Sequence, residues 1–157
     1  MNLKEYNLIV EKTSDDLFRF ALRYTGDEDE SNDAVQDCLV TLWENHSKIH
    51  ADRAKGYLMR VLYHRLVDRH RRRKRLAGES LIPEESYCPH NDYELHDSIE
   101  KMLATLPEVQ RMLLLLRDLE GYSYKEMADM TGLNEQQVMT YLYRARVKAR
   151  KYLTENR

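Results

Sequence analysis

A stretch near the carboxyl end of the chain carries polar side chains that recur at helical spacing. One face holds, at i, i+3, i+4 and i+7, Gln137, Thr140, Tyr141 and Arg144. Amide, hydroxyl and guanidinium groups form hydrogen bonds with base edges in the major groove of DNA. We therefore predict that this face, together with Gln136 beside it, contacts base pairs.

The sequence around this face predicts how it is held. The opposite side is apolar and predicts a helix that packs inward. Its apolar positions, at i, i+4, i+7 and i+11, are Val138, Leu142, Ala145 and Ala149. Ser123 with Glu126, and Asn134 with Gln137, have the spacing of capping boxes and predict two helix starts. Separated by a tight turn at residues 131–133, the two helices form a helix-turn-helix.

Basic residues continue along this helix toward the end of the chain. Residues 144–157 contain six Lys or Arg and one acid, Glu155. Such side chains reach phosphates, which position a protein on DNA without reading its sequence. The candidates for this role are Arg146, Lys148, Arg150 and Lys151. The alternative interpretation of the region is an ordinary amphipathic helical hairpin.

A second basic stretch lies at residues 60–75, with eight Lys or Arg against Asp68 alone. An apolar stripe that includes Leu58, Leu62 and Leu66 predicts a long helix over residues 53–75. We predict that its other face follows the phosphates of nucleic acid. The contact residues expected there are Arg60, His64, Arg71, Arg72 and Arg73. Tyr57 and Tyr63 either stack on unpaired bases or pack within the protein. A nuclear-localisation or heparin-type patch is the other interpretation of the basic run.

The amino-terminal part of the chain predicts two further helices. The first carries the stripe Leu17, Phe18, Phe20, Ala21 and Tyr24, and Gly26 ends it. We expect the acidic residues 27–30 to form a turn, and Ser31 or Asn32 to cap the second helix. The apolar positions of that helix are Val35, Leu39, Leu42 and Trp43. Residues 46–51 are predicted to form a loop.

Residues 76–91 form the best candidate for a linker between domains. They contain Gly78, Pro83 and Pro89, and their apolar residues show no period. Residues 76–100 hold seven acids and no Lys or Arg. We expect an all-α protein of two small helical domains, at residues 1–75 and 92–157, joined by a flexible acidic linker. In the second domain, Pro107 should lie in a first turn, and Val109, Leu113 and Leu116 should line one face of the helix.

Composition excludes several classes of protein. The longest apolar run, residues 112–116, is far too short to span a bilayer, so we expect no membrane insertion and a cytoplasmic protein. Two cysteines do not make a disulfide framework. No phosphate-binding loop or catalytic motif is present, so we expect neither an enzyme nor a cofactor. Cys88, His90 and His96 have no second ligand pair, and we expect no metal site.

Five blocks of the sequence resemble the extracytoplasmic-function (ECF) sigma factors of bacteria. Residues 33–43, DAVQDCLVTLW, resemble the polymerase-binding helix of that family, and residues 57–68 resemble its promoter-melting helix. Residues 106–108 and 121–128 resemble its second domain, and residues 138–146 its recognition helix. The sequence departs from the family pattern at Met139 and Tyr141, where basic residues are common, at His64, where Asn is frequent, and at Ala34 and Cys38, which are smaller than usual.

The resemblance implies a function and partners. It implies binding to the bacterial RNA polymerase core through Asp33, Gln36 and Asp37. The long helix would hold a −10 type promoter element, with an unpaired base captured near residues 46–51, and the second domain would read a −35 type element as duplex. An anti-sigma factor is a further expected partner. A stand-alone helix-turn-helix repressor, which binds paired half-sites as a dimer, is the alternative.

Overall fold

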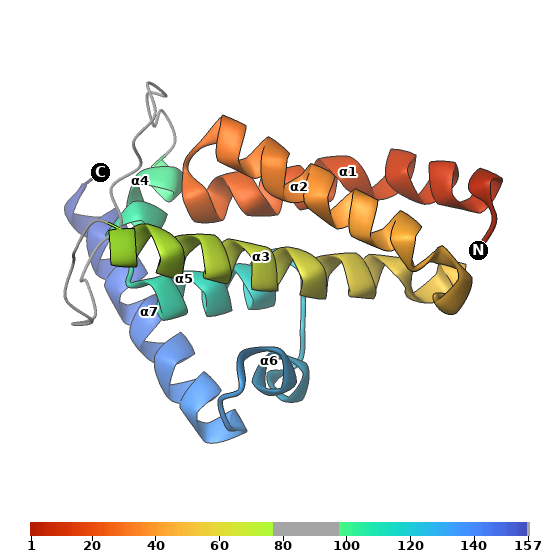
Figure 1. Cartoon of the computed structure of the whole chain (residues 1–157). Helices are drawn as coiled ribbons and strands as arrows, with labels where there is room; N and C mark the ends of the chain where they lie inside the picture. The colour runs from red at the N-terminus through yellow and green to blue at the C-terminus, as the bar shows by residue number, and fades with distance from the viewer. Residues whose placement is uncertain (77–97, 157) are drawn as a thin grey trace. The chain divides into compact units, whose positions relative to one another are not determined.

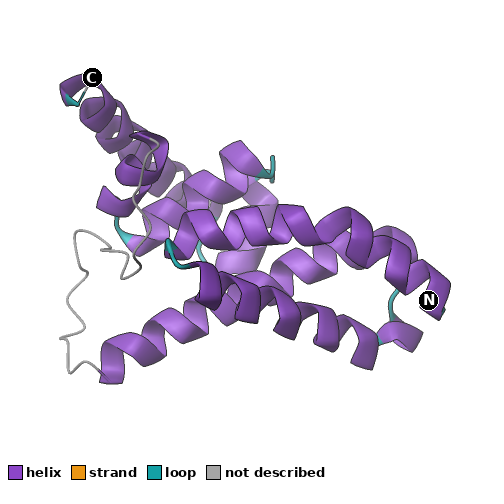
Figure 2. Cartoon of the chain, turned by 90° about the horizontal axis from the view of Figure 1, so that it is seen from above, coloured by secondary structure: helices purple, strands orange, loops and turns teal. Residues whose placement is uncertain are grey.

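A computed structural model of the chain describes residues 1–76 and 98–156. Within these residues the secondary structure consists of seven α-helices, two short 3-10 helices and one π-helical turn, with no strand (Figure 2). The all-α class is therefore confirmed. The chain divides into two compact units, Met1–Ile82 and Pro83–Arg157. The predicted linker, apart from its first residue, lies outside the described residues.

Unit 1 is a bundle of three helices that pack on one another in pairs (Figure 1). They are α1 (Leu3–Thr25), α2 (Glu28–Glu44) and α3 (Ala54–Leu76). The short helices η1 (His46–Lys48) and η2 (Ala51–Arg53) connect α2 to α3, so the predicted loop is partly helical. The core side chains without any exposed surface include Leu17, Phe20, Leu42, Leu58 and Leu62.

The start of α2 differs from the sequence prediction. The acids expected to form a turn lie in the first helical turn, and Asp27 caps the helix by accepting a hydrogen bond from the Glu30 amide at 3.0 Å. Negative side chains are stabilised at a helix N-terminus, where the backbone dipoles leave a partial positive charge. The predicted caps at Ser31 and Asn32 were therefore wrong. Ser31 is buried inside the helix, and its hydroxyl lies 2.9 Å from the Thr25 hydroxyl.

The buried face of α2 also differs in part from the predicted stripe. Trp43 is 39% exposed, whereas Ala34 and Cys38 are fully buried. These two positions are the ones where the sequence is smaller than the family pattern, so α2 can approach its neighbours closely there. Burial raises the pKa of the Cys38 thiol to about 12, because the thiolate would lose its hydration.

Unit 2 is built around the last helix. Its elements are α4 (Ser98–Thr105), α5 (Glu108–Leu114), the π-helical turn η3 (Leu115–Leu119), α6 (Tyr124–Thr131) and α7 (Glu135–Glu155). α7 contacts α4, α5 and α6. Both predicted capping boxes are present, at Ser123 and at Asn134, and Gly132 ends α6 in the left-handed conformation with φ of 80°. The predicted helix-turn-helix is thus formed by α6 and α7.

Two features of α5 were not predicted. Val109 is 44% exposed, whereas Leu113 and Leu116, predicted on the same face, are fully buried. Arg111 is 1% exposed. Its guanidinium donates hydrogen bonds to the carbonyl oxygens of Leu103, at 3.0 Å, and Leu106, at 2.9 Å. Leu103 lies in the last turn of α4 and Leu106 directly follows the helix, so carbonyls at this helix end satisfy the buried cation.

Candidate nucleic-acid interface

The recognition helix α7 separates into a buried face and an exposed face as the sequence predicts. Val138, Leu142 and Ala145 are at most 1% exposed. The predicted base-reading residues lie on the solvent side. Gln136, Gln137, Thr140 and Arg144 are exposed, and Tyr141 is half-buried.

Some polar groups of this face already have partners within the helix. The Gln137 carboxamide oxygen accepts a hydrogen bond from the Asn134 amide at 3.0 Å, which closes the capping box. The Thr140 hydroxyl donates to the Gln136 carbonyl at 3.0 Å. Each side chain keeps hydrogen-bonding capacity, because the amide NH2 of Gln137 and the oxygen lone pairs of Thr140 are not used in these bonds.

The cations of α7 are held by neighbouring groups. The Arg144 guanidinium carbon lies 5.8 Å from the centre of the Tyr141 ring, a cation–π contact that keeps both side chains at the surface. Arg146 donates from Nη2 to Asp118 Oδ1 at 2.8 Å, and this hydrogen bond raises the pKa of the Arg146 guanidinium. Lys148 is half-buried. Arg144, Arg146 and Lys148 therefore differ in how far they are available to DNA.

Two exposed apolar side chains of α7 were missed in the sequence prediction. Met139 is 52% exposed and Tyr143 is 70% exposed. They lie at i and i+4, so the two side chains are neighbours on the helix surface. Their positions fall outside the apolar stripe that packs inward, and this was the signal available in the sequence.

The exposed face of α3 carries the second group of predicted contacts. Arg60, His64, Arg71, Arg72 and Arg73 are all exposed. Tyr63, with 9% of its surface exposed, packs in the core and is not placed to stack on a base, whereas Tyr57 is half-buried.

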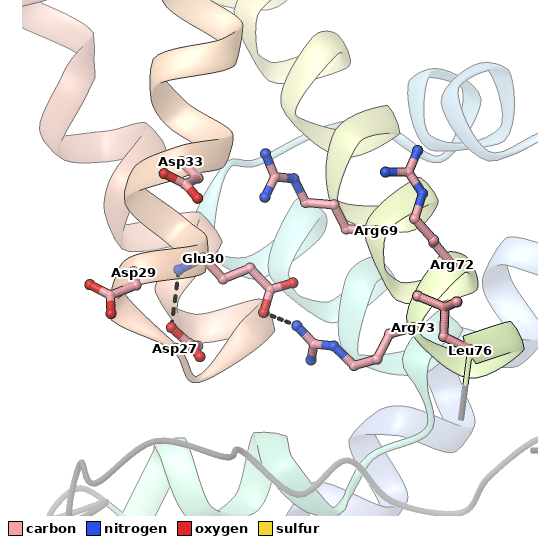
Figure 3. Close-up of a pocket in the computed structure, with 8 residues that line it drawn as sticks. All are labelled: Asp27, Asp29, Glu30, Asp33, Arg69, Arg72, Arg73 and Leu76. Carbon is pink, nitrogen blue, oxygen red and sulfur yellow. Dashed lines mark hydrogen bonds and ion pairs between the residues drawn. The ribbon is translucent and has the colours of Figure 1, made fainter. Parts of the chain in front are cut away.

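An open groove of about 430 Å³ runs between the start of α2 and the end of α3 (Figure 3). Acids of α2 line one side, and the other side is formed by arginines of α3. Glu30, whose side chain is 12% exposed, pairs with Arg73. Arg69, which also lines the groove, pairs with an acid just beyond it, and Arg69 Nη2 lies 2.6 Å from Asp37 Oδ2.

The predicted polymerase-binding residues lie on α2, where they have different surroundings. Asp33 and Gln36 are exposed. Asp37, with 47% of its side chain exposed, faces α3 through its ion pair with Arg69. The structure therefore places Asp33 and Gln36 at the free surface, and Asp37 at the boundary with α3.

Aromatic rings gather where α2 ends. The Trp43 ring stacks on the His46 ring with 4.2 Å between centres and 11° between planes. The Tyr6 ring meets Trp43 edge-on at 5.0 Å, and the Tyr6 hydroxyl donates to the Leu39 carbonyl at 2.9 Å. The stacked pair fixes the start of the segment for which capture of an unpaired base is predicted.

Comparison with known proteins matches both units. The family model for Sigma-70 region 2 matches residues 9–76, and that for Sigma-70, region 4 matches residues 96–148. The chain is 26% identical to the ECF RNA polymerase sigma factor SigE of Mycolicibacterium smegmatis, over 98% of this chain and 63% of that protein. It is 25% identical to the RNA polymerase sigma factor SigV of Bacillus subtilis, over 89% of this chain and 86% of that protein.

Solved structures share the fold. The sigma factor RpoE from Bartonella quintana, in complex with the anti-sigma factor NepR, matches with a TM-score of 0.76 and 22% identity, over 99% of this chain and 100% of that one. CnrH, in complex with the cytosolic domain of CnrY, matches with a TM-score of 0.71 and 22% identity, over 99% and 92%.

Regions 2 and 4 on one chain define a sigma factor of the sigma-70 family, a class that is regulatory rather than catalytic. Within that class the chain belongs to the ECF sigma factors. The resemblance found in the sequence is therefore confirmed, and the stand-alone repressor is not favoured. Among the described helices, none has the length and apolar character needed to cross a membrane.

Proposed function

We propose that this chain binds the core of bacterial RNA polymerase, directs it to promoters with two separate elements, and helps to open the DNA. The observation that carries the proposal is that regions 2 and 4 each contain a helix with an exposed basic face, α3 in one and α7 in the other. The chain spans 63% of the length of the SigE relative, so its activity and partners are proposed on the residues it contains.

Unit 1 is proposed to hold the downstream, −10 type element. The exposed side chains Arg60 and His64 lie toward the start of α3, and Arg71 and Arg72 toward its end. At 1.5 Å per residue, the 11 positions between Arg60 and Arg71 extend over about 16 Å, which is long enough to follow several phosphates of one strand. The aromatic cluster beside η1 supplies a flat surface for an extruded base.

Unit 2 is proposed to read the upstream, −35 type element as duplex. The exposed amino-terminal half of α7 has the position that the second helix of a helix-turn-helix takes in the major groove. Gln136, Gln137, Thr140, Tyr141 and Arg144 are the proposed base contacts. Arg146 and Lys148 are proposed to reach phosphates nearby.

The exposed polar edge of α2 is the proposed polymerase-binding surface. Asp33 and Gln36 lie at i and i+3, and Asp37 completes the edge one position later. Acidic and amide groups on an exposed face suit a basic partner surface. We also propose the cytoplasm, where polymerase and promoters meet, as the site of action. An anti-sigma factor is a proposed partner, since both structural relatives are described in complexes, and the RpoE complex names one.

The test separates polymerase binding from DNA binding. The purified chain, alone and with core polymerase, is footprinted on promoter DNA, and transcription from that promoter is measured. We expect specific protection and transcription only with polymerase. Asp33→Arg combined with Gln36→Ala should abolish both, because like charges across an interface cost several kcal/mol. The combined variant should keep its circular dichroism spectrum, since exposed substitutions change stability by about 0.5 kcal/mol or less.

A matched control uses Glu11→Arg, which reverses an exposed acid on α1 instead of α2 and should leave polymerase binding unchanged. If the chain alone protects a specific duplex site tightly at physiological salt, and the α2 variants behave like wild type, the protein acts as a repressor and the proposal is wrong.

A further inference from the structure

The exposed face of α7 contains two apolar side chains that no proposed role uses. Met139 and Tyr143 expose 52% and 70% of their surface, more than any other apolar side chain of α7. Met139 cannot donate a hydrogen bond, and its thioether sulfur is a weak acceptor. A partner surface with apolar groups therefore suits this side chain best.

The neighbours of these two side chains indicate what lies against them. Gln136 is next to Met139 at i−3, and Thr140 is next to Tyr143 at i−3. The exposed cations Arg146 and Arg150 lie seven positions after Met139 and Tyr143, two turns further along the same side of the helix. Met139 and Tyr143 thus form an apolar patch with hydrogen-bonding groups and cations around it. Such a surface is complementary to a nucleic acid, which is a polyanion, if the groove that faces the patch contains apolar groups.

The major groove of DNA offers one apolar group to a recognition helix, the 5-methyl group of thymine. We infer that Met139 and Tyr143 of α7 recognise thymine methyl groups in the upstream promoter element, and so help to determine its sequence. This inference rests on the proposed function of unit 2. Met139 supplies a flexible, polarizable side chain that fits an uneven apolar surface, and Tyr143 supplies a rigid ring.

A contact with the methyl group predicts that the protein prefers thymine to uracil. The hydrogen-bonding groups of this face cannot produce that preference. Hydrogen-bonding side chains read nitrogen and oxygen atoms of the bases, and these atoms are the same in thymine and uracil. Removing the methyl group removes only the apolar contact. Each lost methyl should weaken binding about fourfold, which corresponds to about 0.8 kcal/mol, the value of one buried CH2 group.

The experiment uses polymerase reconstituted with the full-length chain. A selection from a randomised upstream element identifies the preferred sequence, and thymines in it are then replaced one at a time by deoxyuridine. We expect one or two positions at which deoxyuridine weakens binding about fourfold. Met139→Ala or Tyr143→Ala should weaken binding to the thymine duplex by a similar factor and remove the difference between thymine and uracil at one of these positions.

Two control variants keep the test specific. Met139→Leu retains an apolar side chain and should keep the preference for thymine. Val147→Ala, on the same helix and 44% exposed, lies one turn beyond Tyr143 and should leave the preference unchanged. All variants are compared by circular dichroism, so that loss of folding is recognised separately.

The possible outcomes are distinct. If wild-type polymerase complex binds thymine and deoxyuridine duplexes equally at every position, the inference is wrong while the proposed function stands. If Met139→Ala weakens assembly with polymerase and leaves the thymine preference intact, the side chain contacts protein and the inference is also wrong. If the complex recognises no upstream element at all, the proposed function of unit 2 fails, and the inference fails with it.

Discussion

Helices α3 and α7 both carry many basic residues, but they present their charge differently. On α3, Arg69 pairs with Asp37 and Arg73 pairs with Glu30, both acids of α2. On α7, Arg146 pairs with an acid of the π-helical turn, and the exposed face otherwise mixes amide, hydroxyl and apolar groups. The face of α3 suits contacts with phosphates, which carry no sequence information, whereas that of α7 suits contacts with base edges.

The difference shows that a count of basic residues overstates the charge available to a nucleic acid. The sequence places eight Lys or Arg between residues 60 and 75. At least two of these arginines share their charge with acids of α2. Release of such an arginine to a phosphate requires that an ion pair within unit 1 is broken.

The largest effect is expected from a charge placed in the core of unit 2. Val138→Asp puts a carboxylate at a position with no exposed surface, where it has no partner, and it should unfold α7 and the helix-turn-helix. Unit 1 should keep its fold, so thermal unfolding followed by circular dichroism should lose part of the helical signal and retain a transition for α1–α3. Thr140→Asp, on the exposed face two residues away, is the matched control and should retain both units.

A smaller effect should separate the two basic helices by what they read. Arg144→Ala should weaken binding of the polymerase complex to its best upstream element by about 1–3 kcal/mol and leave binding to unrelated DNA nearly unchanged. Arg71→Ala on α3 should weaken binding to all sequences alike. Competition footprinting with promoter variants measures both. Equal losses across sequences for Arg144→Ala would contradict the assignment of the α7 face.

The raised pKa of Cys38 should make the free energy of unfolding of unit 1, but not that of unit 2, depend on pH. Its pKa is about 12 in the folded chain, above the ordinary thiol value of 9.0, so unfolding is favoured as pH rises between these values. The stabilisation is fully present below pH 9 and should decrease by about 1.4 kcal/mol per pH unit above it. Urea unfolding from pH 8 to pH 10, with Cys38→Ala as the control for other titrating groups, should show a flatter pH dependence in the variant.

Much of the fold could be predicted because local rules and tertiary packing agree. The capping boxes at Ser123 and Asn134 set helix starts by local hydrogen bonds, and the period of Val138 and Leu142 sets the buried face of α7. The start of α2 was missed because acidic residues are typical both of turns and of first helical turns. Arg111 was missed because its burial depends on carbonyls of another helix.

In the candidate site, too, the sequence predicted features that depend on one helix and missed those that depend on contacts between helices. Exposure of the predicted residues follows from helical period, and it was correct for Gln136, Thr140 and Arg144. The ion pair of Arg69 with Asp37 joins residues 32 positions apart, and no pattern within one helix contains it. The contact roles of these residues stay predictions until the polymerase and DNA experiments are made.

The smallest expected effect concerns the salt dependence of DNA binding. It shows whether acids of α2 keep arginines of α3 from binding phosphates. In Asp37→Asn, Arg69 loses the carboxylate that lies 2.6 Å away and becomes available to a phosphate. Each additional phosphate contact steepens the dependence of log K on log salt by about 0.9 for duplex DNA. Non-specific binding of the chain to duplex DNA, measured by fluorescence anisotropy between low and moderate salt, should therefore show a slope steeper by about that amount.

The matched control for this variant is Asp33→Asn, which removes the same charge from an exposed position one turn earlier on α2. It should raise affinity slightly at low salt, since net charge becomes less negative, but it should leave the slope unchanged. In the double variant Asp37→Asn with Arg69→Gln the slope should return to the wild-type value. The stability cost of each single variant should stay within about 1 kcal/mol, as is usual for partly exposed ion pairs. Equal slopes for Asp37→Asn and Asp33→Asn would show that Arg69 does not reach DNA, and α3 would then contact phosphates through its exposed arginines alone.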